Sequence, residues 1–187
     1  MALWVLVAVA AIMILWVVVT YNGLIGLRNQ TANGWRQIDV QLKRRHDLIP
    51  NLVNTVRGAM EFERDTLTQV MEARARAVAA TGPADAARRE GELTQALGRL
   101  IAVAENYPAL KANDNVKMLQ EELSSTENKV GFARQFYNDI ATKYNIAQQT
   151  FPANTLASTF GFKPAELFEL QDQTERAVPA VDLSMRK

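Results

Sequence analysis

The chain opens with an unbroken apolar run and then changes to a regular alternation of apolar and polar positions. Residues 1–19 are wholly apolar, and no side chain from Met1 to Leu27 carries a charge. As a helix rising about 1.5 Å per residue, this stretch spans the roughly 30 Å of a bilayer's hydrocarbon core. Because it outlasts the apolar part of a cleaved signal peptide and has no basic residue before it, we predict a retained transmembrane anchor over residues 1–23.

Beyond the anchor, apolar residues recur at steps of three and four, the period of helices that pack side by side. The longest run extends over residues 116–147, and shorter runs cover residues 35–42, 49–77 and 93–107. Glu63 and Arg74 interrupt the 49–77 run, and because a buried charge needs a partner, each is expected to meet an opposite charge on another helix or to lie where the apolar face opens. The pattern predicts several amphipathic helices that cover one another's apolar faces.

Helix-breaking residues separate these runs. Pro50 has no backbone N–H to donate, so we expect a boundary or a sharp kink over residues 46–51. Gly82 and Pro83 are suited to the end of one helix and the start of the next, and Pro108 follows the third run. The predicted helices therefore cover residues 24–47, 51–80, 84–107 and 114–148. Short links favour antiparallel neighbours, so the predicted fold is all-α, with the transmembrane helix continuing into a long antiparallel four-helix bundle over residues 24–150.

The remaining residues, 151–187, form an aromatic-rich tail that holds four of the seven phenylalanines. A short helix starting at Pro164 and a partly disordered end are expected. Such an apolar segment should not remain in water, so it folds back on its own bundle, docks on another subunit or partner, or enters the membrane interface. The candidate partner or self-association surface comprises Phe151, Phe160, Phe162, Leu167 and Phe168.

Charge refines the membrane topology. No basic side chain precedes the anchor, whereas Arg28 and Arg36 follow it, so the N-terminus is predicted outside and the C-terminal bundle in the cytoplasm. If the second bundle helix returns to the membrane, Arg88 and Arg89 lie near the lipid headgroups, and headgroup contact and a solvated face both remain open for them. The whole chain is nearly neutral, with 21 basic and 20 acidic residues, so nucleic acid is not an expected partner.

Side chains that carry chemistry are few. The chain has no cysteine and one histidine, His46, and Lys43 stands where a Glu-x-x-His metal pair needs glutamate. His46 is expected to cap helix carbonyls or touch the helix dipole. Glu61, Glu63, Glu121 and Glu122 are the carboxylates considered for acid–base work, and their spacing singles out no pair. We therefore predict no catalytic residues, no metal, no cofactor and no enzymatic activity.

Several long strings of the sequence resemble the LemA family of bacterial membrane proteins. They are W-R-Q-I-D-V-Q-L-K-R-R-H-D-L-I-P-N-L-V from Trp35, N-Y-P-A-L-K-A from Asn106, L-Q-E-E-L-S-S-T-E-N-K-V from Leu119, A-R-Q-F-Y-N-D from Ala133 and F-G-F-K-P-A-E-L-F from Phe160, with Tyr21-Asn22 and Leu27-Arg28-Asn29 before them. The resemblance implies an N-terminal membrane helix followed by a helical bundle in the bacterial cell envelope. It supplies no catalytic residues, and it implies an accessory or scaffold role with links to membrane protein quality control.

These observations favour a membrane-anchored scaffold or interaction protein of the bacterial inner membrane that contacts lipids and forms homo-oligomers. The anchor, the uninterrupted apolar runs and the aromatic tail lead to this hypothesis. The alternative is an accessory or regulatory subunit of a membrane protease or quality-control system.

Overall fold

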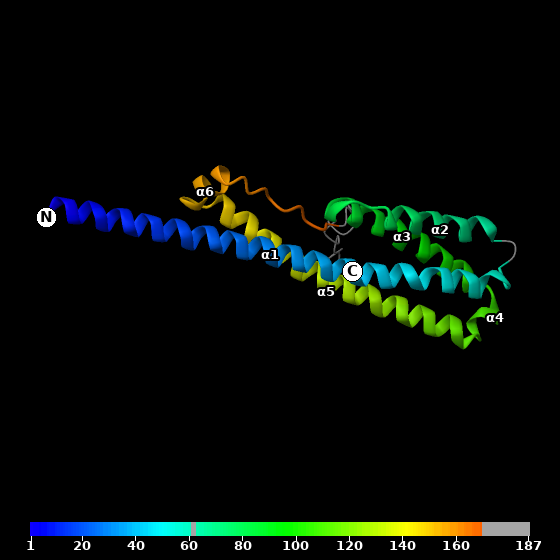
Figure 1. The fold of residues 1–187 in the computed structure, drawn as a ribbon. Coiled ribbons are helices and arrows are strands. Elements are labelled where there is room, and N and C mark those ends of the chain that lie inside the picture. Colours follow the sequence, from blue (N-terminus) through cyan, green and yellow to red (C-terminus); the bar gives the residue numbers. More distant parts are fainter. Residues whose placement is uncertain (61–62, 170–187) are drawn as a thin grey trace, which may run out of the picture.

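The computed structural model of the protein describes residues 1–60 and 63–169. All regular elements in these ranges are helices, and Figure 1 shows them arranged along one long rod, α1. The helices are α1 (Ala2–Arg57), α2 (Arg64–Val78), α3 (Gly82–Ala104), α4 (Pro108–Lys111), α5 (Asp114–Gln149) and α6 (Ala153–Thr159). The prediction of an all-α fold with a long apolar N-terminal helix that continues into a bundle is therefore confirmed.

The expected break at Pro50 is wrong, because α1 runs through this residue and ends at Arg57. A proline cannot donate to the carbonyl four residues before it, which here belongs to His46. The Nε atom of Arg74, on α2, donates to that carbonyl oxygen at 2.6 Å. Because this side chain from the neighbouring helix satisfies the carbonyl that the proline leaves without a donor, the proline destabilises α1 less than it would an isolated helix. In place of the helices expected over residues 24–47 and 51–80, the structure has the longer α1 and the shorter α2.

Other helix ends follow the local sequence. Gly82 has φ +78°, in the left-handed region that glycine adopts without a steric penalty, and Pro83 occupies the first turn of α3. The Asn113 side chain accepts hydrogen bonds from the backbone N–H groups of Asn115 and Val116, which fixes the start of α5. Between the helices predicted over residues 84–107 and 114–148, the structure has the four-residue helix α4.

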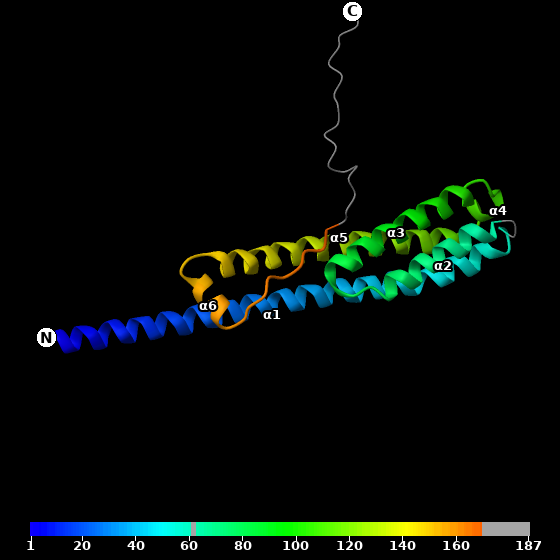
Figure 2. The same cartoon turned by 90° about the horizontal axis from the view of Figure 1, so that it is seen from above.

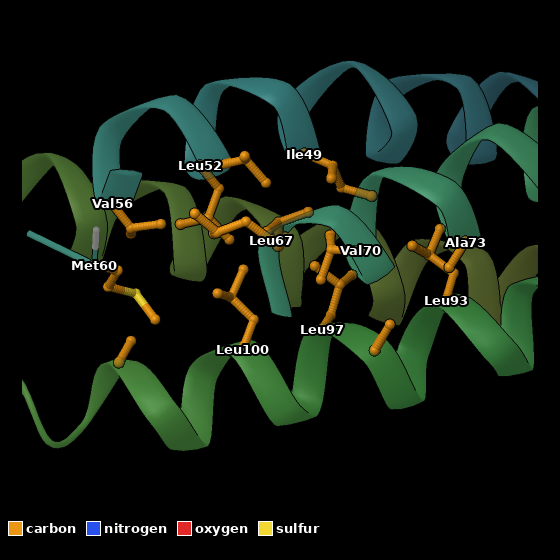
Figure 3. Packing of buried hydrophobic residues seen from close by; sticks show 14 of the residues in the cluster. Ile49, Leu52, Val56, Met60, Leu67, Val70, Ala73, Leu93, Leu97 and Leu100 are labelled. Atoms are coloured by element: carbon orange, nitrogen blue, oxygen red, sulfur yellow. The ribbon is translucent and has the colours of Figure 1, made fainter. Parts of the chain in front are cut away.

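α1 and α5 form a long antiparallel pair, and the α2–α3 hairpin covers only the part of this pair that lies far from the N-terminus (Figures 1 and 2). The main core lies beneath this hairpin, where all four long helices contribute side chains, many of which Figure 3 shows from close by. Its fully buried large members are Ile49, Leu52, Val53, Val56, Met60, Val70, Leu93 and Leu100. Burial of each such side chain contributes about 1.5–3 kcal/mol to folding, so this end of the bundle is the best-covered part of the α1–α5 pair.

A second cluster of buried residues lies nearer the N-terminal end, beyond most of the hairpin. It joins Ile38 and Leu42 of α1 to Ala86 and Ala87 of α3, to three residues of α5, and to Phe168 of the C-terminal segment. The α5 side chains at steps of three and four from Val116 to Ala147 are buried or half-buried along its whole length. The C-terminal segment thus covers the stretch of α1 and α5 that the hairpin leaves open.

The N-terminal part of α1 projects alone from the bundle (Figure 2). Its large apolar side chains are exposed from Leu3 to Leu15, and Leu24 is the first buried residue of the helix. Among the described helices, α1 alone is long and apolar enough to cross a membrane by length and composition. Exposed apolar surface on this scale is stable in lipid rather than in water, which agrees with the anchor predicted from the sequence.

Candidate functional site

The C-terminal segment runs from α6 back along the bundle without regular secondary structure over residues 162–169 (Figure 2). Two asparagines of α5 hold its backbone. The amide of Asn145 donates to the Ala165 carbonyl at 2.9 Å and accepts from the Ala165 N–H at 2.8 Å. Asn138 makes the same pair of bonds with Phe168, at 3.1 and 2.9 Å. Each asparagine therefore imitates one residue of a neighbouring β-strand.

The spacing of the two asparagines explains why this arrangement fits. Seven residues along an α-helix rise about 10.5 Å. Three residues of an extended chain cover about 10 Å. The step between Asn138 and Asn145 therefore matches the step between Ala165 and Phe168, and we call these two asparagines the amide clamp. The helix expected to begin at Pro164 is wrong, because the clamp pairs with an extended backbone, and the short helix of the tail is instead α6.

Phe168 is the apolar anchor of the clamped segment, with an exposed fraction of only 1%. Its ring lies 6.1 Å from that of Trp35, and Trp35 lies 5.9 Å from Tyr137, so three aromatic rings join the segment to α1 and α5. The Tyr137 hydroxyl donates to the Glu166 carbonyl at 2.6 Å. Burial raises the pKa of Tyr137 to about 12, with a further contribution from the Glu166 charge, so the tyrosine stays neutral at ordinary pH and keeps donating.

The five residues of the predicted partner surface therefore do not form one exposed surface, because the fold buries some of them and leaves others exposed. Phe168 is buried and Leu167 packs half-buried against the second cluster, so both serve this chain's own bundle. Phe162 lies beside Tyr21 and under the guanidinium of Arg28, which is 5.6 Å from its ring centre. Phe160 also contacts Tyr21 but is 55% exposed, and Phe151 is 81% exposed. The tail's end, which the sequence predicts to be partly disordered, lies outside the described residues.

A buried ionic group crosses the interface between α1 and α3. Glu90 is 3% exposed, and its two carboxylate oxygens meet Arg45 at 2.9 Å and the Nε2 atom of His46. Arg45 also donates to the Thr94 hydroxyl at 2.9 Å, while its Nε has no partner. The expectation that His46 caps helix carbonyls is wrong. α1 continues past His46, and the His46 ring points to Glu90. One carboxylate therefore joins two consecutive residues of α1 to α3.

Arg88 and Arg89 lie beside this ionic group. Their neighbour Glu90 contacts Arg45, which is roughly 30 Å along α1 from residue 23 at about 1.5 Å per residue. α2 returns only part of the way toward the apolar end of α1, so the structure does not bring these arginines to the level of the predicted membrane surface (Figure 1). Both instead form ion pairs with Asp85, whose pKa is lowered chiefly by the hydrogen bond from Arg88.

Of the carboxylates considered for acid–base chemistry, Glu61 lies outside the described residues, and the other three have separate surroundings. Glu63 accepts a hydrogen bond from the Tyr107 hydroxyl at 3.4 Å, Glu122 pairs with Arg44 at 2.6 Å, and Glu121 is exposed on α5. Within residues 1–60 and 63–169, no group of three histidine, aspartate or glutamate side chains is placed to hold a metal ion. Sequence reasoning missed the amide clamp and Glu90, although two asparagines seven residues apart beside an apolar run are a readable signal for the clamp.

These features define an all-α membrane protein whose polar groups chiefly fix how its helices and tail pack. The model of the LemA family matches residues 34–183, which is most of the chain, so the protein belongs to the LemA family. This confirms the resemblance seen in the sequence strings.

Curated relatives agree with this assignment. Magnetosome protein MamQ 2 of Paramagnetospirillum magneticum is 29% identical over 175 residues, covering 80% of this chain and 64% of that protein. MamQ of Magnetospirillum gryphiswaldense is 26% identical, covering 79% and 64%. Protein LemA of Metamycoplasma hominis is 25% identical, covering 81% and 69%. The chain thus spans just under two thirds of the length of the magnetosome proteins that it matches.

Proposed function

We propose that the protein is a membrane-anchored scaffold that associates with itself and presents its helical bundle to other proteins of the cell envelope. The observation that carries this proposal is the combination of a bare apolar helix end with a bundle whose buried polar groups are engaged in packing contacts. The bare apolar end of α1 supports a role at a membrane, and the magnetosome proteins described above are relatives over most of this chain. No substrate or reaction enters the proposal.

Self-association predicts that the full-length protein, extracted in a mild detergent, has a mass corresponding to two or more chains. Light scattering coupled to size-exclusion chromatography measures this mass once the detergent contribution is subtracted. The matched control is the same protein in a harsher detergent that separates the subunits while circular dichroism still reports a helical chain. A strictly monomeric particle in the mild detergent, with residues 151–187 intact, contradicts the proposal.

We further propose that α1 crosses the bacterial inner membrane once, with its N-terminus outside and the bundle in the cytoplasm. The positive charges of Arg28 and Arg36 just after the apolar run support this orientation. The exposed rings of Phe151 and Phe160 stand at the same end of the bundle as Tyr21, which is where aromatic side chains favour the headgroup layer. This corner of α6 is therefore the proposed lipid contact, in place of Arg88 and Arg89.

The orientation predicts the behaviour of reporters fused after Lys187. A fluorescent protein that matures only in the cytoplasm is expected to be bright there, and an alkaline phosphatase that is active only outside is expected to be inactive. The reverse pattern contradicts the orientation while leaving the anchor itself in place. The same two reporters fused to a protein of known topology provide the control.

The alternative, an accessory subunit of a membrane protease or quality-control system, rests on the family resemblance. Glu63, Glu121 and Glu122 are the carboxylates to substitute in its test. If one substitution abolished proteolysis in membranes while the helical content was preserved, this alternative would be favoured over the scaffold.

A further inference from the structure

A ridge on the outer face of the α1–α5 pair separates two hollows of opposite charge. Phe132 of α5 forms the ridge and is 75% exposed. On one side lies a groove lined by Arg36, Val40, Lys129 and Phe136 among others, and no carboxylate is among its lining residues. On the other side lies a hollow whose described lining residues include the acidic Glu127, Asp139 and Glu169 and the basic Arg134. Phe132 lines both.

Large apolar side chains are exposed together along this ridge. Val40 is 62% exposed and Phe136 is 47% exposed, and both stand in the same groove as Phe132. These side chains lie on the two longest helices, away from the main core that α2 and α3 cover. A cluster of exposed large apolar residues with a charged rim is typical of a surface that binds protein. Lipid is not its occupant, since Arg36 lies roughly 20 Å beyond residue 23 along α1.

We propose that a second copy of this chain covers the ridge, in a symmetric dimer whose two-fold axis runs parallel to α1. This inference rests on the self-association proposed above and names its surface. Two copies anchored in one membrane by α1 share the same direction, so only an axis perpendicular to the membrane relates them. A rotation about that axis places the basic groove of each copy opposite the acidic hollow of the other.

The heights of the charges along the bundle agree with this pairing. Lys129 and Glu127 are two residues apart on α5, a rise of about 3 Å, so Lys129 meets the partner's Glu127 at nearly the same level. Gly34 of α1 packs directly against Tyr137 of α5, since a Cβ atom added to it would lie 3.4 Å from the Tyr137 Cα. The two residues therefore stand at the same height in the antiparallel pair. Arg36 is then about level with residue 135, within about 6 Å of the height of Asp139. Two charge pairs on each side of the axis thus flank the phenylalanines at its centre.

An acidic helix from another protein is a poorer occupant. It would complement the basic groove but would meet Glu127 and Asp139 across the ridge, where like charges oppose binding. A second copy satisfies both hollows at once. The surface is therefore self-complementary in charge, which is the requirement for a two-fold interface.

The absence of cysteine from the chain permits a direct test by single-cysteine crosslinking in membranes. Phe132→Cys and Phe136→Cys, one helical turn apart, are each expected to form disulfide-linked dimers under a mild oxidant, because each residue lies near its own symmetry mate. Ala102→Cys, exposed on α3, is the matched control and is expected to remain monomeric. Crosslinking of Phe132→Cys but not of Phe136→Cys indicates an antiparallel dimer and contradicts the parallel dimer proposed here. Crosslinking of both variants no better than the control also overturns the proposal.

Charge exchange gives the second measurement. Lys129→Glu is expected to weaken the dimer about tenfold, equivalent to about 1.4 kcal/mol, because each copy loses an attraction and gains a repulsion. Adding Glu127→Lys to that variant is expected to restore the dimer, since residues two apart on one helix do not face each other and the rescue must act between chains. Failure of the rescue contradicts the pairing. If the native chain is oligomeric but neither cysteine crosslinks, the scaffold stands and this face is excluded. A monomeric native chain removes the proposed self-association itself.

Discussion

Glu90→Ala is expected to lower the free energy of unfolding by about 3–5 kcal/mol, the cost of leaving a buried charge without its partner. The substitution removes both contacts that Glu90 makes, and Arg45, only 4% exposed, keeps its hydrogen bond to the Thr94 hydroxyl. Urea denaturation in detergent, followed by circular dichroism, measures the change. The expected result is a transition at a much lower urea concentration.

Glu92→Ala is the matched control, two residues further along the same helix. Glu92 pairs with Arg76 and Arg89, but its side chain is 37% exposed, and exposed pairs of this kind contribute about 0–1 kcal/mol. A double substitution, Glu90→Leu with Arg45→Leu, is expected to recover most of the loss because it removes both charges together. If Glu90→Ala costs no more than Glu92→Ala, the ionic group does not stabilise the contact between α1 and α3.

Phe168→Ala is expected to release the C-terminal segment from the bundle. Truncating a fully buried phenylalanine costs about 3–5 kcal/mol, an amount comparable with the entire stability of a small domain. Because Phe168, the amide clamp and the Tyr137 hydrogen bond hold the same short segment, the loss is expected to appear as local opening, in which the clamp and the Tyr137 hydrogen bond come apart together. The rest of the helical bundle is expected to stay folded.

Cleavage after Glu166 by a glutamate-specific endoprotease measures this release, since the Glu166–Leu167 bond becomes accessible when the segment detaches. Phe151→Ala is the matched control, because it removes the same side chain at a position that is 81% exposed, and it is expected to leave the cleavage rate unchanged. A substitution in the clamp, Asn138→Ala, is expected to have an intermediate effect of about 1–3 kcal/mol, since it leaves the backbone groups of Phe168 unpaired. Equal cleavage of all three variants contradicts the role of Phe168 as anchor.

The elements that the sequence predicted well are those with a local cause. The apolar run of residues 1–19 favours the hydrocarbon core of a membrane, whatever sequence follows it. The three-and-four period of α5 depends on the pitch of a helix, so its buried face from Val116 to Ala147 is readable without any neighbour. Likewise, Gly82 and Pro83 act through their own backbone geometry, and the structure uses both at the helix boundary expected.

The elements that the sequence did not predict depend on residues far away in the chain. Pro50 remains inside α1 because Arg74 supplies a donor to the carbonyl of His46, 28 residues before it. The tail is extended at Ala165 because an asparagine of α5, 20 residues earlier, pairs with its backbone. Local propensity gives no sign of either partner.

The sequence by itself thus determined the anchor, the helical class and the apolar faces, because the backbone fixes the period of a helix and lipid or neighbouring helices are the only cover for such surfaces. The tertiary structure alone decided that α1 continues through Pro50, which carboxylate is buried between α1 and α3, and which phenylalanines stay exposed. The physical reason is that a proline's orphaned acceptor, a buried charge and an apolar ring each depend on a specific partner. Which partners meet is set only when the faces pack.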